Sequence, residues 1–375
     1  MVLLSACFST SPGVSVMDRR LFLKNTAALS ATAAAGPILL GTEDKSENKP
    51  LVTGEGEHRY EVIHDWAKLP DKFTWQTTHN VAVDSQGNVY VIHEGRKELK
   101  DHPSIFVFDP TGKYIRSFGP QFQGGGHGIE IRKEGSEEFL YVCAYQHLKT
   151  FAKMTLNGET VWQKYAPMDS KVYAAGEDTN PTGAWGQNRF MPTNFAWVPG
   201  GTDFLLVDGY GGFVVHRYDK DGNWKSHFGG PGKGEGKFNT PHGLWVDTRG
   251  AEPRIVVCDR AHNTLQFFDL NGKYQKTVKG FGLPANAEIY KGLLVIPELH
   301  ARISILDKDD NVIARLGDDV ARVTGKDGGA IRGDSKKWQN GKFVHPHDAC
   351  FDADGNILVA EWVATGRISK LRKVS

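Results

Sequence analysis

The stretch that decides the fold is Pro241-His242-Gly243-Leu244-Trp245-Val246-Asp247, because the same pattern recurs along the chain. In each copy a polar residue opens an alternating strand, an apolar strand follows, and a third strand leads into a turn. The other five copies open at His79, His127, Asn194, Asn286 and His347. Recurring units of this kind are typical of repeat architectures, in which each unit forms one small sheet. Each copy is therefore predicted to be one blade of a β-propeller.

The turns and the two ends of the pattern predict how the ring closes. Several third strands end in a hairpin signal such as Asp219-Lys220-Asp221-Gly222, whose Gly tolerates positive φ. A fourth, outer strand follows, as in residues 113–118. The sixth copy ends with residues 368–373 and lacks an outer strand, which residues 60–63 can supply. We predict an all-β, six-bladed β-propeller whose N-terminal strand closes the last blade and leaves no open sheet.

The charge balance excludes partners that need a strong electrostatic field. Lys and Arg number 45 and Asp and Glu number 44 in the 375 residues, so neither nucleic acid nor an anionic membrane surface is indicated. We therefore expect a small molecule or a peptide bound in a local site at the channel mouth. A protein partner at the rim is the other class that the composition allows.

The N-terminal segment differs in composition from the repeats. Asp18-Arg19-Arg20-Leu21-Phe22-Leu23-Lys24 is followed by a short, Ala-rich stretch, which resembles a twin-arginine export signal. The apolar stretch is too short and soft for a permanent transmembrane helix. We expect a signal peptide in residues 1–41, with Met17 as a second candidate start, a polar linker in 42–59 and the propeller in 60–375. The expected location is periplasmic or secreted, with no stable membrane insertion after the signal is removed.

Cysteine usage points to buried thiols. Cys143, Cys258 and Cys350 lie inside apolar strand patterns and are odd in number. Cysteine in such a setting behaves as a small apolar residue. We expect these three to be free and buried.

The opening residues of the copies predict a ring of polar side chains. When the copies are aligned on Asp84, Asp247 and Asp352, the residue five places earlier is a histidine in each: His79, His242 and His347. Matching the other copies by pattern adds His127, Asn194 and Asn286. In a propeller these positions face the central channel at one end. Neutral imidazoles that converge there suit Zn²⁺ or another divalent transition metal, whereas a single histidine would more often be a hydrogen-bonded core residue.

Alternate copies are favoured as the ligand set. Copies two, four and six are about 120° apart around a sixfold axis. His127, His242 and His347 could therefore supply three nitrogens at about 2.0–2.1 Å from a zinc ion. Three protein ligands leave one position open, which is typical of a catalytic metal site.

Two resemblances follow from these motifs. The Gly-rich run from Phe228 to Pro241 resembles the NHL repeat. From about Asn80 to its end the chain also resembles the peptidyl-α-hydroxyglycine α-amidating lyases, which are six-bladed propellers of NHL type. The likeness is sharpest in four motifs: Val207-Asp208-Gly209-Tyr210, Pro241-His242-Gly243-Leu244, Cys258-Asp259-Arg260 and Pro346-His347-Asp348.

The lyase resemblance implies roles for matching residues. His127, His242 and His347 would hold a catalytic zinc, Tyr210 would be the general base, and Arg260 would be an active-site arginine. A structural Ca²⁺ would be bound by main-chain oxygens of Val81 and Ile129 and by the carboxylate of Asp348. The implied reaction cleaves the C–N bond of a carbinolamide to give an amide and glyoxylate. Tyr210 would need nearby cationic charge, such as Arg260 and the metal, to act as a base near neutrality.

The chain departs from that family at several positions. A second family arginine falls in register on Glu94, and Arg96 two residues on is the only arginine that could replace it locally. His345 stands where the family has a methionine, and His79 adds an imidazole to the ring. The cysteines of the family's disulfides are absent. These departures leave the reaction open.

Two long inserts, residues 165–191 and 318–344, join blades at the ring end of the predicted channel. Loops over a propeller mouth commonly select the substrate. Candidate wall residues in the inserts are Trp185, Arg189, Trp338 and Lys342.

Three functions are therefore kept in view. The first is an exported zinc lyase of the amidating type. The second is a non-catalytic NHL propeller that binds a protein, peptide or glycan at its rim. The third is a lactonase-like hydrolase, although such propellers place carboxylate and Asn ligands where this chain has His.

Overall fold

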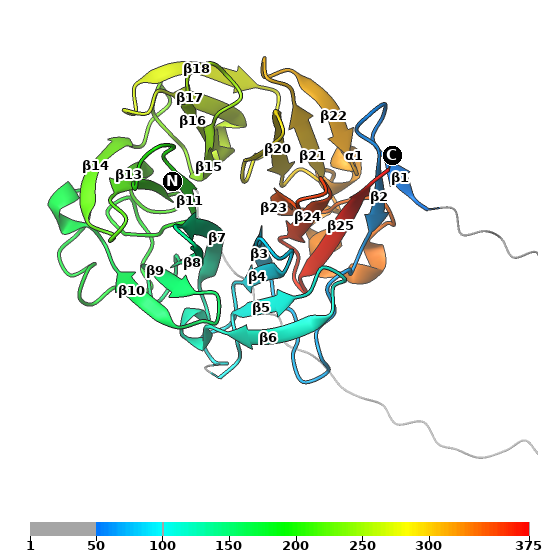
Figure 1. Ribbon diagram of the computed structural model, residues 1–375, viewed down its shortest axis with the longest axis horizontal. Coiled ribbons are helices and arrows are strands. Elements are labelled where there is room, and N and C mark those ends of the chain that lie inside the picture. The colour runs from blue at the N-terminus through cyan, green and yellow to red at the C-terminus, as the bar shows by residue number, and fades with distance from the viewer. Residues whose placement is uncertain (1–49, 100, 375) are drawn as a thin grey trace, which may run out of the picture. The chain divides into compact units, whose positions relative to one another are not determined.

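The computed structural model describes residues 50–99 and 101–374, and it confirms the six-bladed β-propeller (Figure 1). Six antiparallel sheets surround a common centre, and within each the first strand of the copy is innermost. The expected signal peptide, residues 1–41, lies outside the described residues.

The first three blades contain four strands each. Blade 1 consists of β3 (Thr78–Val83), β4 (Val89–His93), β5 (Ile105–Phe108) and β6 (Tyr114–Phe118). Blade 2 consists of β7 (Gly126–Glu134), β8 (Glu137–Ala144), β9 (Thr150–Thr155) and β10 (Thr160–Lys164). Blade 3 consists of β11 (Asn194–Trp197), β12 (Phe204–Asp208), β13 (Val214–Tyr218) and β14 (Trp224–Gly229).

The remaining blades follow the same order until the chain closes on itself. Blade 4 consists of β15 (Pro241–Asp247), β16 (Arg254–Asp259), β17 (Thr264–Phe268) and β18 (Tyr274–Lys279). Blade 5 consists of β19 (Glu288–Tyr290), β20 (Leu293–Glu298), β21 (Arg302–Leu306) and β22 (Val312–Leu316). Blade 6 consists of β23 (Pro346–Phe351), β24 (Ile357–Glu361), β25 (Arg367–Lys373), β2 (Tyr60–Ile63) and β1 (Val52–Thr53).

The last blade is closed by the N-terminal strand, as expected. Strand β2 pairs antiparallel with β25, with Tyr60 opposite Lys373 and Ile63 opposite Lys370. Strand β1 adds to the far side of β2, which extends the sheet to Val52. The predicted linker, residues 42–59, thus overlaps the folded sheet at its described end. Joining both ends of the chain in one blade removes an exposed sheet edge inside the ring.

The core lies between neighbouring blades. Between blades 1 and 2, for example, Ile92 and Val107 pack with Ile129 and Leu140, and all four are buried. Each apolar sheet face is covered by the next blade, so the positions of the inner strands are fixed by packing on both sides. Cys143, Cys258 and Cys350 are buried and free, as predicted.

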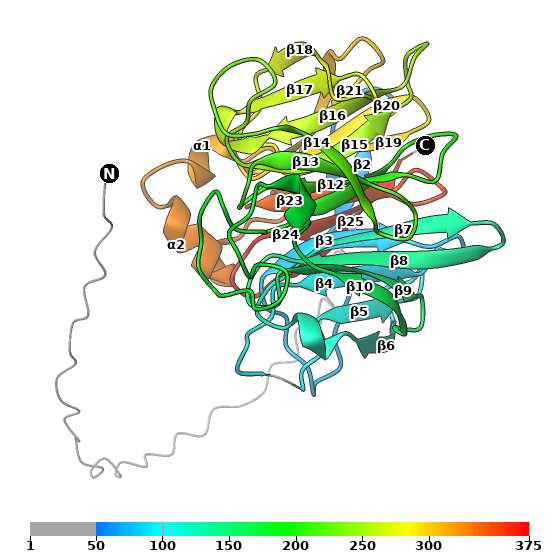
Figure 2. The same cartoon turned by 90° about the vertical axis from the view of Figure 1, so that its left-hand side faces the viewer.

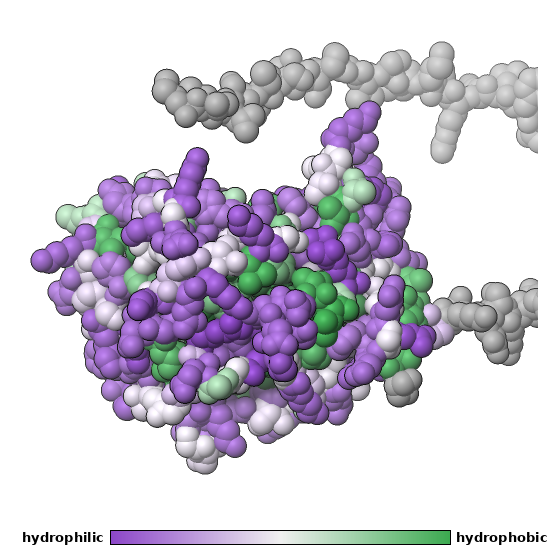
Figure 3. Space-filling model, turned by 90° about the horizontal axis from the view of Figure 1, so that it is seen from above, coloured by the Kyte–Doolittle hydropathy of each residue, from purple (hydrophilic) through white to green (hydrophobic). Residues whose placement is uncertain are grey.

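The helices are short and lie outside the blades. The insert before blade 6 carries α1 (Val320–Val323), α2 (Gly328–Gly333) and the 3₁₀ helix η4 (Ser335–Lys337), and Figure 2 shows α1 and α2 together on one face of the ring. The other 3₁₀ turns are η1 (Pro120–Phe122), η2 (Met168–Ser170) and η3 (Arg260–His262). Among the described residues no helix has the length and apolar character to span a bilayer. The surface in Figure 3 is mostly hydrophilic, with scattered apolar areas.

Candidate metal centre at the propeller mouth

Four histidines meet where the inner strands begin. His79 lies on β3, His127 on β7, His242 on β15 and His347 on β23. Each side chain is at most 2% exposed. Neighbouring ring centroids are 4.5–4.9 Å apart. The predicted ring of imidazoles therefore converges at one end of the inner strands.

Three of these histidines are oriented by the same kind of contact. The Nδ1 atom of His127 is 2.8 Å from the main-chain oxygen of Thr193, and that of His242 is 2.7 Å from the oxygen of Ala285. The Nδ1 atom of His347 is 2.8 Å from the main-chain oxygen of His79. A carbonyl accepts only, so each Nδ1 carries the proton and each Nε2 keeps its lone pair. Histidines that bind metals are commonly held in this way.

The electrostatic setting keeps the same three rings neutral. Burial is the main cause that lowers the pKa of His127, His242 and His347 well below the usual value. Neighbouring imidazoles and the positive charge of Arg260 lower it further. The neutral imidazole is the form that binds metal. In addition, the buried Nε2 of His347 has no hydrogen-bond partner among the described residues, so this lone pair is available to a ligand.

The distances between ligand nitrogens and the orientations of the imidazole rings favour different sets of three histidines. Ligand nitrogens of His79, His127 and His347 all lie within 4.8 Å of one another, so these buried histidines can form a metal site. His242 is outside that compact group and has the carbonyl contact that His79 lacks. Orientation favours His127, His242 and His347 as ligands, because side-chain rotation can adjust a separation more easily than it can create a supporting hydrogen bond.

His79 is paired with a carboxylate instead. Its Nε2 lies 3.5 Å from Glu94 Oε2, beyond the length of a good hydrogen bond. The other carboxylate oxygen of Glu94 accepts hydrogen bonds from the Tyr145 hydroxyl at 2.9 Å and from Gln146 Nε2 at 3.0 Å. Burial would raise the pKa of Glu94, but contacts with His79 and Tyr145 and the charge of Arg332 lower it overall. Glu94 is therefore an anion at the mouth.

Tyr210 and Arg260 lie directly against the ring. The Tyr210 hydroxyl is 2.8 Å from His242 Nε2 and 3.3 Å from His127 Nε2, and Arg260 Nη1 donates to it at 3.2 Å. The Arg260 guanidinium also lies over the Tyr210 ring, 5.1 Å from its centroid. Burial raises the pKa of Tyr210, and Arg260 only partly offsets this. Arg260 alone therefore leaves the phenol protonated.

Tyr145 and Trp362 are mouth residues that the repeat pattern could have identified. Each comes directly after the second strand of its blade, at the same place as Glu94 and Arg260 in theirs, and Tyr210 lies one residue farther on in blade 3. The Tyr145 ring is 5.2 Å from that of His127 and 4.9 Å from that of Tyr210. The residue that follows the second strand can be compared across the copies in the same way as the residue that opens the first strand. That comparison singles out both Tyr145 and Trp362.

Some candidates lie outside this cluster. The Arg96 side chain is exposed and makes no hydrogen bond to the four histidines in the described structure. His345 Nδ1 bonds the main-chain oxygen of Leu299 at 2.5 Å, and its ring faces Trp362 at 5.9 Å. Asn194 is buried at the start of β11, and both amide atoms lack partners among the described residues.

The two inserts contribute unequally to the mouth. Trp185 stacks near Tyr210 and Tyr145, with centroids 5.5 and 5.8 Å away, and remains 55% exposed. The other predicted wall residues have structural contacts: Arg189 pairs with Glu177, Trp338 bonds Ile331, and Lys342 bonds Asp318.

The residues of the expected calcium site lie farther along the inner strands. Asp348 accepts hydrogen bonds from the Val81 amide at 2.9 Å and from Asn286 Nδ2 at 2.6 Å. Ile129 is buried on β7, and no hydrogen bond joins it to Asp348 in the described part of the chain. Burial raises the pKa of Asp348 to about 6.

Two further carboxylates accompany Asp348. Burial and then the charge of Asp348 raise the pKa of Glu130 and of Glu288 well above the usual value. Glu130 and Glu288 lie on β7 and β19, the inner strands of blades 2 and 5. Oxygen-rich groups of this kind are ligands that Ca²⁺ prefers, so the residues present fit a hard cation.

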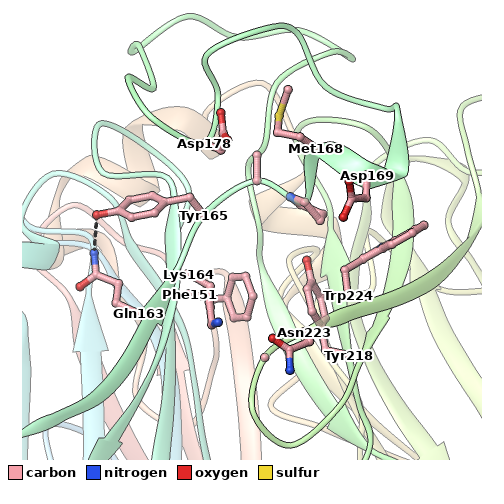
Figure 4. Close-up of a pocket in the computed structure, with 13 residues that line it drawn as sticks. Phe151, Gln163, Lys164, Tyr165, Met168, Asp169, Asp178, Tyr218, Asn223 and Trp224 are labelled. Carbon is pink, nitrogen blue, oxygen red and sulfur yellow. Dashed lines mark hydrogen bonds between the residues drawn. The ribbon is translucent and has the colours of Figure 1, made fainter.

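A pocket elsewhere is unrelated to the ring. It has a volume of about 520 Å³ and lies between the outer strands of blades 2 and 3, below the first insert (Figure 4). Tyr165, whose hydroxyl accepts a hydrogen bond from Gln163 at 2.9 Å, is part of its wall. None of the four histidines lines it.

The chain is similar to known proteins over part of its length. No family model matches the chain. It is 29% identical over 213 residues to human NHL repeat-containing protein 3, covering 56% of each chain, and 28% identical over 207 residues to the mouse protein. The match therefore spans about half the length of these relatives.

Solved structures agree on the fold. A catalytically inactive virginiamycin B lyase from Staphylococcus aureus has a TM-score of 0.52 and 13% identity, covering 84% of this chain and 100% of that one. A gluconolactonase from Xanthomonas campestris has a TM-score of 0.52 and 12% identity, covering 84% and 89%. Together with the NHL relatives, these similarities support a six-bladed propeller of NHL type.

Proposed function

We propose that this chain is an exported, zinc-dependent lyase that cleaves the C–N bond of an α-hydroxyglycine-type carbinolamide. The observation that carries the proposal is the shared orientation of His127, His242 and His347, whose Nδ1 atoms are tied to carbonyl oxygens. Three neutral imidazoles that keep their Nε2 lone pairs, two of which meet the Tyr210 hydroxyl, match a zinc site with an open position. A zinc ion bound there would supply Lewis-acid activation of a hydroxyl oxygen.

We assign the transfer of the substrate proton to Tyr210. Its hydroxyl already contacts the Nε2 atoms of His127 and His242, so it lies where the substrate hydroxyl would meet the ring. Arg260 donates to the same oxygen and would stabilise the phenolate. In the proposed reaction the Tyr210 phenolate takes the hydroxyl proton, the C–O bond becomes the carbonyl of glyoxylate as the C–N bond electrons pass to nitrogen, and that nitrogen takes the proton back from Tyr210. The products are an amide and glyoxylate.

The mouth groups supply binding and shielding. Trp185, Tyr145 and Tyr210 form an aromatic wall with centroids 4.9–5.8 Å apart. Such a wall would exclude water from the reacting centre and pack on an apolar or peptide group.

A second cation belongs to the same proposal. Asp348, with main-chain oxygens of Val81 and Ile129, would hold a structural Ca²⁺, and Glu130 and Glu288 would add negative charge nearby. Export through the twin-arginine route, which passes folded proteins, fits loading of metals before transport.

The test is metal analysis followed by assay. We expect near-stoichiometric transition metal in the purified protein and glyoxylate release from an α-hydroxyglycine peptide. His242→Ala should lose both metal and activity, whereas His64→Ala, at a histidine outside the ring, should lose neither. Protein without metal would instead support a propeller that binds a partner at its rim. Bound metal with lactone hydrolysis and no glyoxylate would support the hydrolase alternative.

A further inference from the structure

Arg332 is held at the mouth by the second insert. It lies on α2 (Gly328–Gly333), and its guanidinium stacks on Trp362 with 3.6 Å between the guanidinium carbon and the ring centroid. Its Nε donates to the main-chain oxygen of Trp362 at 3.2 Å, and its own main-chain oxygen accepts from the Ala364 amide at 3.2 Å. These contacts fix the position of the side chain and do not use its two terminal nitrogens.

The terminal nitrogens of Arg332 lack an anionic partner. No carboxylate of the described chain lies within 4.0 Å of them, and they make no hydrogen bond to a described residue. The side chain is half-buried. A partly desolvated guanidinium without a counter-ion is unfavourable unless a ligand pairs with it.

Arg332 lies near residues that also surround the four histidines. Its positive charge acts on Glu94 and Tyr145, which lie at the mouth, and on His345, whose ring faces Trp362. Trp362, on which it stacks, occupies the position in blade 6 that Tyr145 and Arg260 occupy in theirs. The other arginine at the mouth, Arg260, is already engaged with Tyr210. Among the mouth arginines of the described chain, Arg332 is therefore the one whose two terminal nitrogens both lack a hydrogen bond.

We propose that Arg332 binds the carboxylate of the substrate and so selects α-hydroxy carboxylates over their neutral amides. This inference rests on the proposed function, because the carbinolamide considered there ends in such a carboxylate. The planar fork of a guanidinium matches a carboxylate through two parallel hydrogen bonds. The nearby anion Glu94 would disfavour a dianionic group such as phosphate.

The experiment compares two small probes on the zinc-loaded protein. Glycolate and glycolamide share a hydroxyl group and differ in carrying a carboxylate or a neutral amide. Isothermal titration calorimetry should give a Kd for glycolate roughly 10- to 100-fold lower than that for glycolamide, the range expected for one charge-assisted interaction. Arg332→Ala should remove this preference, Arg332→Lys should restore part of it, and Arg96→Ala should leave it unchanged. Metal content and thermal unfolding of each variant report whether the site is intact.

The outcomes separate this inference from the proposed function. Loss of the preference in Arg332→Ala, in protein without lyase turnover, would support the role of Arg332 and overturn the lyase. Lyase turnover with an unchanged KM and unchanged glycolate binding in Arg332→Ala would support the lyase and overturn the role of Arg332. A wild-type protein that binds glycolate no more tightly than glycolamide would also overturn it, as would Arg332→Gln with wild-type preference.

Discussion

The Nδ1 atom of His242 lies 2.7 Å from the main-chain oxygen of Ala285, and the residue that allows this approach is Gly243. A Cβ at Gly243 would lie 2.5 Å from the same oxygen and 2.3 Å from Asn286 Oδ1. In blade 2, a Cβ at Gly128 would likewise lie 2.5 Å from Thr193 O, which holds His127. In these two blades glycine after the histidine thus leaves room for the next blade to orient the imidazole, whereas His347 makes the same kind of contact although Asp348 follows it.

Gly243→Ala should therefore weaken metal binding without touching a proposed ligand. Displacing Ala285 removes the hydrogen bond that orients His242, and loss of such support typically costs 10- to 100-fold in metal affinity. Overpacking should lower the free energy of unfolding by about 1–3 kcal/mol. Competition with a zinc chelator and denaturant unfolding measure the two effects. Gly234→Ala is the matched control, because nothing lies within 4 Å of its Cβ position. Equal metal affinity in the two variants would contradict the supporting role of Ala285.

Tyr210→Phe should separate metal binding from chemistry. The phenol contacts ring nitrogens only through its hydroxyl, so the variant should keep its zinc. If Tyr210 moves the proton, kcat should fall roughly 10²- to 10⁴-fold with a smaller change in KM. Steady-state assay of glyoxylate release, with metal analysis of the same sample, checks this expectation. Near-normal kcat in zinc-loaded protein would rule out the assigned role.

The fold and the histidine ring could be predicted mainly from the register of the repeats. Aligning copies on Asp84, Asp247 and Asp352 predicts three of the four histidines, and the looser repeat pattern adds His127, because strand alternation fixes which residues face the centre once the fold is known. The contacts from Nδ1 to carbonyl oxygens could not be predicted in this way, since they join residues 66, 43 and 268 positions apart. Arg332 could not be predicted either, because it lies in an insert without periodicity. Arg96, the arginine that the sequence offers two residues after Glu94, is exposed.

Removal of Ca²⁺ should destabilise the wild-type protein through Asp348. If a cation is bound near Asp348, Glu130 and Glu288, a calcium chelator that spares the zinc will leave the buried carboxylate of Asp348 and its two half-buried neighbours uncompensated. We expect the Tm to fall on chelation and to recover with added Ca²⁺. Asp348→Asn should start at a lower Tm and respond less to chelation, whereas Asp354→Asn, at an exposed turn, should respond as the wild type does. A calcium-independent wild-type Tm would exclude the site.

Acid stability should depend on His216, which is not one of the ring histidines and belongs to a hydrogen-bond network with Tyr173 of the first insert. Its Nδ1 accepts from Trp224 Nε1 at 3.1 Å, and its Nε2 is 2.6 Å from the Tyr173 hydroxyl, which donates to Asp208 at 2.6 Å. This arrangement needs a neutral ring, because protonation of Nδ1 would break the bond from Trp224. Burial, and to a lesser extent the charge of His227, lowers the pKa of His216 to about 3.

The sign of this pH effect follows from the lowered pKa. In the unfolded chain the histidine pKa is about 6.5, so the unfolded state binds the proton first. The stabilising contribution is complete above pH 6.5 and is lost as the pH falls toward 3. At pH 5 the loss should be about 2 kcal/mol. Denaturant unfolding at pH 7 and pH 5 should therefore show a drop that is about 2 kcal/mol larger in wild type than in His216→Gln, which cannot titrate. Equal drops in the two proteins would mean that His216 takes up its proton without disturbing the network.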